Sequence, residues 1–539
     1  MSETERSPLL PKGPPNEPRQ NLVLLWIGVW SMIFISSVDS TIVATLISTI
    51  GSSLESMQLS SWIGTSYLLS FCAFTPLYGR LANIFGRRPS VLFAGTLFGG
   101  GTVLCGFATT MPQLIAFRAI AGIGGGMTVV GSIIVSDSVP LRSRALHQGF
   151  ANVTFAIGGA IGAPIGGWLG STIGWRAAFI GQGPFVFFAL FLLWKEIREP
   201  EFILNADRHS FFSKLKRVDY AGSASLVIGL LCFLVGMHFQ TTAGYGWDNP
   251  RVWGLLTASA VVACAFVLIE GRFAPEPVMP LRMLKRRTPA FANLTMVLLS
   301  VFNFSTIYNV PLYFTAARVR SSAEAGVHLI PLSVMIAFGS VYTGWYMHKT
   351  GRYWWIQVFA CSTVIVTSVA LAFWDAATPE WILYTTLVPF GFGFAALSTT
   401  AILALISSVP TEEIPVATGL LFLSRVMGQV IGVSLSAALA QALLARNLRA
   451  SIIGPGSAEV IEKILDSTEY IHTLPPDLQQ KAAASWLGAI HVVFFCQIGL
   501  AVMVLLSALP IEENDLPGKR SELPTPTCQT TETRQNGTP

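Results

Sequence analysis

Charged residues are scarce in this chain. Asp, Glu, Lys and Arg make up 12% of its 539 residues, roughly half of their share in soluble globular proteins. Hydrophobic residues make up 52%, and the mean hydropathy is +0.58. This composition excludes a soluble globular protein and indicates a chain that is embedded in lipid.

Several motifs that mark enzymes and metal proteins are also absent. The sequence contains no G-x-x-x-x-G-K-[ST] loop for a nucleotide, and neither H-E-x-x-H nor G-x-S-x-G of hydrolases. Its seven cysteines show no CxxC or Cys/His spacing, so we expect neither a zinc site nor a disulfide framework. The sequence therefore predicts no catalytic residues, no metal and no cofactor.

Apolar stretches of about twenty residues recur along the chain, and each can cross the roughly 30 Å hydrocarbon core of a membrane. They predict an all-α membrane protein with about fourteen transmembrane helices. No cleavable signal peptide is expected before the first helix, because residues 1–21 are polar and rich in proline. The predicted helices span residues 22–46, 60–79, 89–109, 112–136, 148–172, 175–194, 219–238, 252–270, 289–314, 325–347, 353–374, 380–408, 415–443 and 485–510.

Lysine and arginine are distributed unequally between the connections. Even-numbered connections carry eighteen of them and odd-numbered ones eight. Because cytosolic loops of membrane proteins carry the excess of basic residues, we expect both termini in the cytosol. This topology also explains the net charge of +5, so no nucleic-acid partner is expected.

A glycine pattern repeats in the two halves of the chain. Gly79 and Gly86 are seven residues apart, and an arginine follows the second of them; Gly344 and Gly351 show the same spacing and the same arginine. Both patterns close the second helix of a group of six. The repeat predicts two six-helix halves with two helices inserted between them, which is a transporter architecture.

This organisation predicts five segments. They are a disordered cytosolic N-tail (1–21), a six-helix half (22–194), a linker with two extra helices (195–288), a second six-helix half (289–510) and a disordered cytosolic C-tail (511–539). The second half includes a long acidic luminal or extracellular loop, 444–484, which we expect to be partly helical.

Two ionisable residues lie at similar depth inside predicted helices. Asp39 comes about 25 Å along the first helix, and Arg118 about 9 Å into the fourth from its outer start. Because an ionisable group within a membrane is costly and needs a partner or a task, we expect the two to pair. Our hypothesis is that this pair couples proton binding to conformational change, with Asp39 taking the proton. The alternative is a purely structural salt bridge.

The second half offers further polar side chains at membrane depth. Among these, Asn309 and Arg425 are our candidates for substrate binding or proton coupling. The alternative for each is a hydrogen bond that holds helices together.

The segment from Gly79 to Arg88, GRLANIFGRR, resembles the signature loop between helices 2 and 3 of the major facilitator superfamily. Its glycines permit a tight turn, and Arg87 and Arg88 can meet helix C-termini and acidic partners, which would latch the two halves in one state. The family usually has an acid where this chain has Asn83. That difference weakens a charge latch, although the amide can still accept a hydrogen bond.

The fifth predicted helix contains Gly149, Gly158, Gly162, Pro164, Gly166 and Gly167, which resemble the antiporter motif of the same superfamily with its proline displaced by one residue. We expect these glycines to pack the helix against its partner in the second half, and Pro164 to bend it. The alternative is that they are ordinary helix-packing glycines.

The resemblance extends over Leu22–Leu509 and implies the fourteen-helix drug:proton antiporter branch. Three segments, 61–69, 75–81 and 136–142, are similar to fungal vacuolar basic amino-acid transporters. The resemblance implies a proton-coupled antiporter that moves amino acids, basic ones above all, into the vacuole; its partners are a small-molecule substrate, protons and the lipid bilayer. Alternatives are multidrug or toxin:proton efflux at the plasma membrane and a nutrient sensor that transports nothing.

The N-tail contains an acidic dileucine pattern, E-x-x-x-L-L, formed by Glu5, Leu9 and Leu10. Sorting adaptors read this pattern in cytosolic tails, so we expect an adaptor as partner and a vacuolar membrane location. The alternative location is the plasma membrane.

Overall fold

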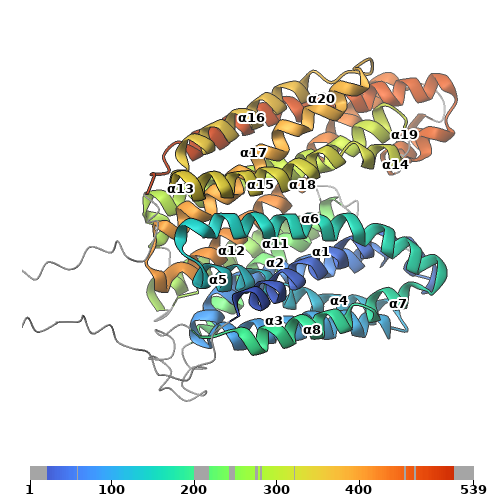
Figure 1. The fold of residues 1–539 in the computed structure, drawn as a ribbon. Coiled ribbons are helices and arrows are strands. Elements are labelled where there is room, and N and C mark those ends of the chain that lie inside the picture. The colour runs from blue at the N-terminus through green and yellow to red at the C-terminus, as the bar shows by residue number, and fades with distance from the viewer. Residues whose placement is uncertain are drawn as a thin grey trace, which may run out of the picture.

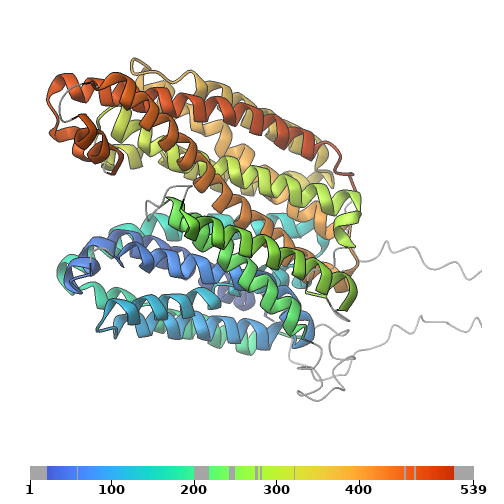
Figure 2. The ribbon, with the colours of Figure 1, turned by 180° about the vertical axis from the view of Figure 1, so that it is seen from behind.

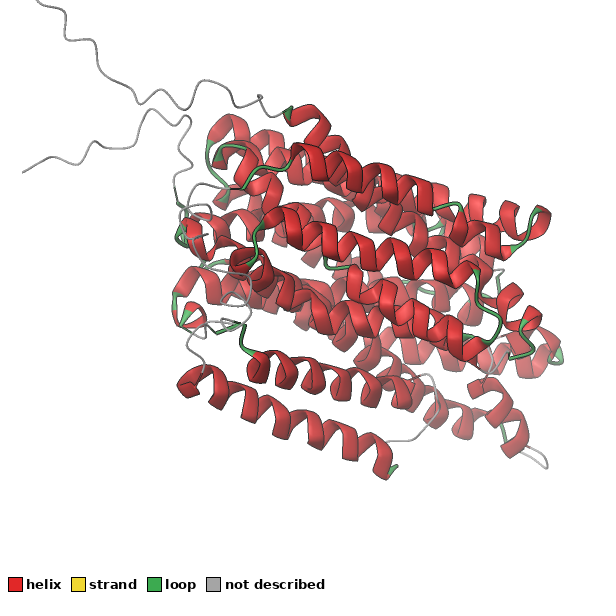
Figure 3. Ribbon diagram, turned by 90° about the horizontal axis from the view of Figure 1, so that it is seen from below, coloured by secondary structure: helices red, strands yellow, loops and turns green. Residues whose placement is uncertain are grey.

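The computed structural model describes residues 21–56, 59–199, 218–241, 249–273, 277–278, 282–320, 322–453, 457–466 and 469–514. Within these ranges the chain is helical without strands, and long helices run side by side (Figures 1 and 3). Twelve of the described helical segments are long and apolar enough to cross a membrane. Helices α2 and α15 run beside these twelve, which confirms an all-α membrane fold of about fourteen helices.

The first group of helices covers residues 22–196. Two of its predicted helices are each divided by a short break, the fourth into α4 and α5 and the sixth into α7 and α8. The bounds are α1 (Leu22–Ser53), α2 (Ser61–Ile84), α3 (Arg87–Gly106), α4 (Met111–Gly124), α5 (Met127–Ser138), α6 (Leu141–Thr172), α7 (Trp175–Ile180) and α8 (Gly183–Glu196).

The second group follows a hairpin of two helices, α11 (Tyr220–Thr241) and α12 (Pro250–Leu268). Helix α11 packs against α2 and α18, so the hairpin lies outside the two groups where they meet (Figure 2). The remaining bounds are α13 (Arg287–Leu312), α14 (Ser322–Val327), α15 (Ile330–Thr350), α16 (Trp354–Ala372), α17 (Glu380–Ser407), α18 (Ile414–Ser451), α19 (Ser457–Asp466) and α20 (Pro476–Ala508).

The predicted loop 444–484 is shorter in the structure. Helix α18 continues to Ser451 and α20 already begins at Pro476, because both helices extend beyond their apolar segments. The short helix α19 lies between them. Lys463 donates a hydrogen bond to Glu459 one turn earlier at 2.7 Å, and this bond lowers the pKa of the Glu459 carboxyl.

The break between α4 and α5 follows from three consecutive glycines, 124–126. A side chain at Gly126 would overlap the ring of Tyr78, so α2 can approach only because this position has none. The hydroxyl of Tyr78 donates a hydrogen bond to the carbonyl of Ile123 at 2.9 Å. An interrupted helix inside a membrane must have its released carbonyl groups satisfied by protein, and Tyr78 does this here.

The repeated glycine pattern has the same structural role in both groups. Gly86 and Gly351 have φ angles of +100° and +73°, a backbone conformation that favours glycine, and they form the turns before α3 and α16. The first glycine of each pattern lies where the groups meet. A Cβ atom at Gly79 would lie 3.2 Å from the carbonyl carbon of Pro415 in α18, and one at Gly344 would lie 2.7 Å from the Ala145 carbonyl oxygen in α6.

The turns before α3 and α16 are also capped in the same way. Glu199, just after α8, accepts hydrogen bonds from the backbone N–H groups of Arg87 and Arg88 at 2.8 and 2.7 Å. Glu513, just after α20, accepts the first N–H groups at the start of α16 at 2.9 and 3.2 Å. A carboxylate stabilises a helix N-terminus by charge and by hydrogen bonding. The prediction of a disordered tail from residue 511 is therefore wrong for residues 511–514, which bind this turn.

The largest contacts between the groups are made by two pairs of helices, α2 with α18 and α6 with α15. We call the end of the bundle that holds Asn21 and Ile511 the terminal end. The close contacts of Gly79 and Gly344 lie near this end, since the turns before α3 and α16 are there. Backbone therefore meets backbone across the two groups on the terminal side of the molecule.

Candidate functional site

The Asp39 and Arg118 side chains meet inside the first group of helices. Nη1 of Arg118, on α4, lies 2.8 Å from Oδ2 and 3.1 Å from Oδ1 of Asp39, on α1. The two side chains are 0% and 1% exposed. Arg118 also donates from Nε to the Ile63 carbonyl at 3.4 Å, and its guanidinium lies over the Tyr67 ring at 4.5 Å. The structure thus places a fully buried ion pair at the contact of α1, α2 and α4.

The glycines of α6 pack against α1 on either side of Asp39. A Cβ atom at Gly162 would lie 2.8 Å from the carbonyl oxygen of Val38, and Cβ atoms at Gly158 and Gly166 would lie 2.7 and 3.1 Å from α1 backbone atoms. The expectation that the motif glycines face the second half is confirmed for Gly149, whose Cβ atom would lie 2.8 Å from the Ser340 carbonyl oxygen in α15, and is wrong for Gly158, Gly162 and Gly166. They face α1 because the opposite side of α6 meets α15, through other residues. Pro164 lies within α6 between two of them.

The signature loop joins the two groups through Asn83. The Arg87 side chain, 1% exposed, contacts Asp137 of α5 at 2.8 Å and donates to Oδ1 of Asn83 at 3.0 Å. The Asn83 amide in turn donates to the carbonyl of Glu412, just before α18, at 3.0 Å. The guanidinium of Arg88 lies over a tryptophan ring of α8 at 5.1 Å. An amide can both accept and donate, so Asn83 links Arg87 to the second group without a charge.

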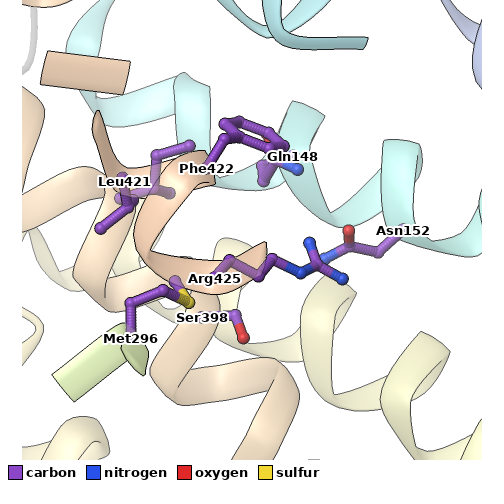
Figure 4. A pocket seen from close by; sticks show the side chains of 8 residues that line it. Gln148, Asn152, Met296, Ser398, Leu421, Phe422 and Arg425 are labelled. Carbon is purple, nitrogen blue, oxygen red and sulfur yellow. The ribbon is translucent and has the colours of Figure 1, made fainter. Parts of the chain in front are cut away.

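A cavity of about 30 Å³ lies between the two groups. Its lining combines neutral polar and apolar side chains with one arginine. Figure 4 shows the guanidinium of Arg425 pointing from α18 toward Asn152 of α6. Each of these two residues comes eleven positions after the start of its helix, about 16 Å from the terminal end and near mid-membrane. The lining residues are Gln148, Asn152, Met296, Ser398, Ile402, Leu421, Phe422 and Arg425.

Asn309, the other candidate of the second half, does not line this cavity. It is completely buried in α13, and its amide donates to the Ser305 carbonyl one turn earlier at 2.8 Å. Its Oδ1 has no hydrogen-bond partner among the residues that the structure describes. The structure therefore does not bring Asn309 and Arg425 together. Glu5, Leu9 and Leu10 lie outside the described residues.

Sequence reasoning missed the polar residues that face Arg425. Gln148 and Asn152 are four residues apart, so they share one face of α6 toward the cavity. Asn152 also donates to Oγ of Ser340 in α15 at 2.9 Å, and this bond joins the two groups at mid-depth. Two amides one turn apart in a membrane helix were the available signal. Sequence reasoning also missed the capping acids Glu199 and Glu513. Each follows the last helix of its group, but the long loop 444–484 in the second half makes this equivalence hard to see in the sequence.

Comparisons with known proteins agree with this architecture. The family model of the Major Facilitator Superfamily matches residues 29–433. The multidrug resistance protein fnx1 of Schizosaccharomyces pombe is 36% identical over 478 residues, which cover 88% of each chain. The vacuolar membrane amino acid uptake transporter fnx2 of the same yeast is 33% identical, covering 86% of this chain and 79% of that protein. Vacuolar basic amino acid transporter 1 of Saccharomyces cerevisiae is 31% identical, covering 77% and 76%.

Solved structures share the fold at low sequence identity. The human organic anion transporter MFSD10 superposes with a TM-score of 0.57 at 14% identity, covering 90% of this chain and 98% of that one. This likeness concerns the fold alone. The family match confirms the resemblance seen in the signature loop. The shared fold, the helices long enough to span a membrane and the two joined groups agree with it. The chain belongs to the Major Facilitator Superfamily and is a multi-pass membrane transporter.

Proposed function

We propose that this transporter exchanges protons for amino acids, basic ones above all, and carries them from the cytosol into the vacuole. Two of the relatives described above are named for vacuolar amino-acid transport, and one of these two for basic amino acids. The observation that carries the proposal is the buried pair of Asp39 and Arg118. Asp39 offers a site for a proton, and the charge of Arg118 is compensated only while Asp39 is ionised.

The pair links proton binding to a change of conformation. A proton on Asp39 removes the counter-charge of Arg118, and an arginine that is buried without a counter-charge is strongly destabilising. Proton binding therefore favours a conformation in which Arg118 finds water or another partner. A ligand shifts a conformational equilibrium only when its affinities for the two states differ. Here Asp39 binds the proton more tightly in the conformation in which Arg118 no longer needs its negative charge.

The packing of α6 offers a route from this pair to the second group. Helix α1 carries Asp39 and rests against the glycines of α6, so a movement of α1 moves α6 as well. The other side of α6 contacts α15 through Gly344 and through the Asn152–Ser340 hydrogen bond. Release of the pair thus loosens the contacts that hold the two groups together near the terminal end.

Orientation follows from the distribution of basic residues. With both termini in the cytosol, the terminal end is the cytosolic side, and the contacts of Asn83, Gly79 and Gly344 close the cavity toward the cytosol. An acidic vacuolar lumen then supplies the protons that leave as the amino acid enters. The dileucine pattern of Glu5, Leu9 and Leu10 would direct the protein to this membrane.

A second candidate is proton-driven efflux of drugs or toxins at the plasma membrane. It is favoured by the 36% identity to a protein named for multidrug resistance. The two candidates differ in the compound that moves and in the membrane that holds the transporter.

The test is uptake of radiolabelled lysine, arginine and histidine by vacuolar vesicles that contain or lack the protein, before and after a protonophore collapses the proton gradient. We expect uptake that depends on both the protein and the gradient, and that Asp39→Asn abolishes. Equal uptake with and without the protein would contradict amino-acid transport. Protein-dependent loss of cationic dyes from whole cells would then support efflux.

A further inference from the structure

The charge of Arg425 is not compensated in the described part of the chain. The buried arginines Arg118 and Arg87 each contact a carboxylate, Asp39 and Asp137 respectively, at 2.8 Å. Arg425 has no ion-pair partner among the described residues, and the cavity lining includes no Asp or Glu. Because a guanidinium stays charged in any protein environment, a positive charge near mid-membrane faces a neutral polar wall.

Neutral polar groups face this charge from two helices. Gln148 and Asn152 belong to α6, and Ser398 belongs to α17. The cavity has room for about two water molecules, so in this conformation water can solvate the guanidinium but an amino acid does not fit. The lining residues come from both groups of helices. A conformational change that moves α6 away from α17 and α18 therefore enlarges the cavity in front of Arg425.

We propose that Arg425 binds the carboxylate of the transported solute. A guanidinium presents a planar fork of donors that matches the two oxygens of a carboxylate, and such charged pairs form stronger hydrogen bonds than neutral ones. A solute that carries only positive charge gains nothing at this position and is repelled by it. The inference rests on the proposed amino-acid transport, and it restricts the substrate to compounds with a carboxylate, which excludes polyamines and apolar cations.

Three ligands that share a side chain isolate the contribution of the carboxylate. Lysine has the carboxylate, lysine amide replaces it with a neutral group, and cadaverine lacks it. Their inhibition constants against radiolabelled lysine uptake are measured in vacuolar vesicles, because an inhibition constant does not depend on the amount of folded protein. The variants are Arg425→Gln, which removes the charge, and Arg425→Lys, which keeps the charge but loses the fork. Lys463→Gln, which removes a positive charge on the exposed helix α19 outside the cavity, is the matched control.

For the unchanged protein we expect lysine to inhibit at least about ten times more strongly than lysine amide or cadaverine, as for a charged hydrogen bond. Arg425→Gln should weaken inhibition by lysine roughly ten- to a hundred-fold. Inhibition by lysine amide and by cadaverine should not weaken, because the variant only removes a charge that repels them, so the preference for lysine disappears. Arg425→Lys should give an intermediate value, and Lys463→Gln should match the unchanged protein.

Two outcomes would overturn the inference. One is cadaverine that inhibits lysine uptake as strongly as lysine itself; the other is an Arg425→Gln protein that keeps the preference for the carboxylate. Either of these leaves amino-acid transport standing. Absence of any protein-dependent lysine uptake, by contrast, contradicts the proposed function itself.

Discussion

Breaking the Asp39–Arg118 pair from one side should be far more damaging than removing both charges. The two side chains are 0% and 1% exposed, so in this conformation neither charge reaches water when its partner is lost. Removing one partner of such a pair costs about 3–5 kcal/mol, whereas replacing both by neutral groups is often close to neutral. Asp39→Asn and Arg118→Gln should each shift the folding equilibrium by about 10²- to 10⁴-fold, and the double variant should recover most of this loss.

The assay has two readouts on the same detergent-solubilised or vesicle-borne protein. Melting temperature at a fixed heating rate reports stability, and lysine uptake with and without a proton gradient reports coupling. The double variant should melt near the temperature of the unchanged protein and yet show no gradient-driven uptake. Lys463→Gln breaks an ion pair whose side chains are 51% and 73% exposed, so as a control it should leave both readouts unchanged.

Two results would refute this reasoning. If Asp39→Asn melts at the same temperature as the unchanged protein, the pair is not the buried charge pair that the geometry describes. If the double variant concentrates lysine in response to the gradient as well as the unchanged protein, the pair is structural and Asp39 does not carry the coupling proton.

Three further substitutions test the packing that surrounds the cavity. Gly79→Ala should force α2 away from α18 and increase labelling, from the terminal side, of a cysteine introduced into the cavity by Ser398→Cys, whereas Gly64→Ala, with no atom near its Cβ, should not; equal labelling would contradict the close contact. Gly162→Ala should separate α6 from α1, cost about 1–3 kcal/mol and lower the melting temperature and uptake, while Gly167→Ala, in open space on the same helix, should change neither. Glu513→Gln weakens the cap of α16 and should destabilise the protein by about 1 kcal/mol, seen as a small decrease in melting temperature; an unchanged value would show that the cap is dispensable.

The positions of the long helices could be predicted because a membrane imposes one length on every apolar crossing. Depth along each helix was equally simple arithmetic, which is why Asp39 and Arg118 could be placed within reach of each other before the structure was known. The repeated glycines marked the turns correctly, since Gly86 and Gly351 both need a backbone conformation that other residues rarely adopt.

Packing partners could not be predicted in the same way. A glycine shows that a backbone approaches closely, but not which one. Gly158, Gly162 and Gly166 were therefore assigned to the second group, although they face α1. The carboxylate of Glu513 lies more than 150 residues from the turn it caps, and no local pattern records that contact. Arg425 was found as a polar residue at membrane depth, whereas the amides opposite it become evident only when α6 and α18 are placed together.

The most direct test of proton-coupled exchange is to follow the protons. Purified protein is reconstituted in liposomes with an acidic interior that contains a trapped pH-sensitive dye, and lysine is added outside. We predict that lysine entry is accompanied by alkalinisation of the interior, and that the protein with both Asp39→Asn and Arg118→Gln shows neither response. Lysine entry without any change in interior pH would contradict the account.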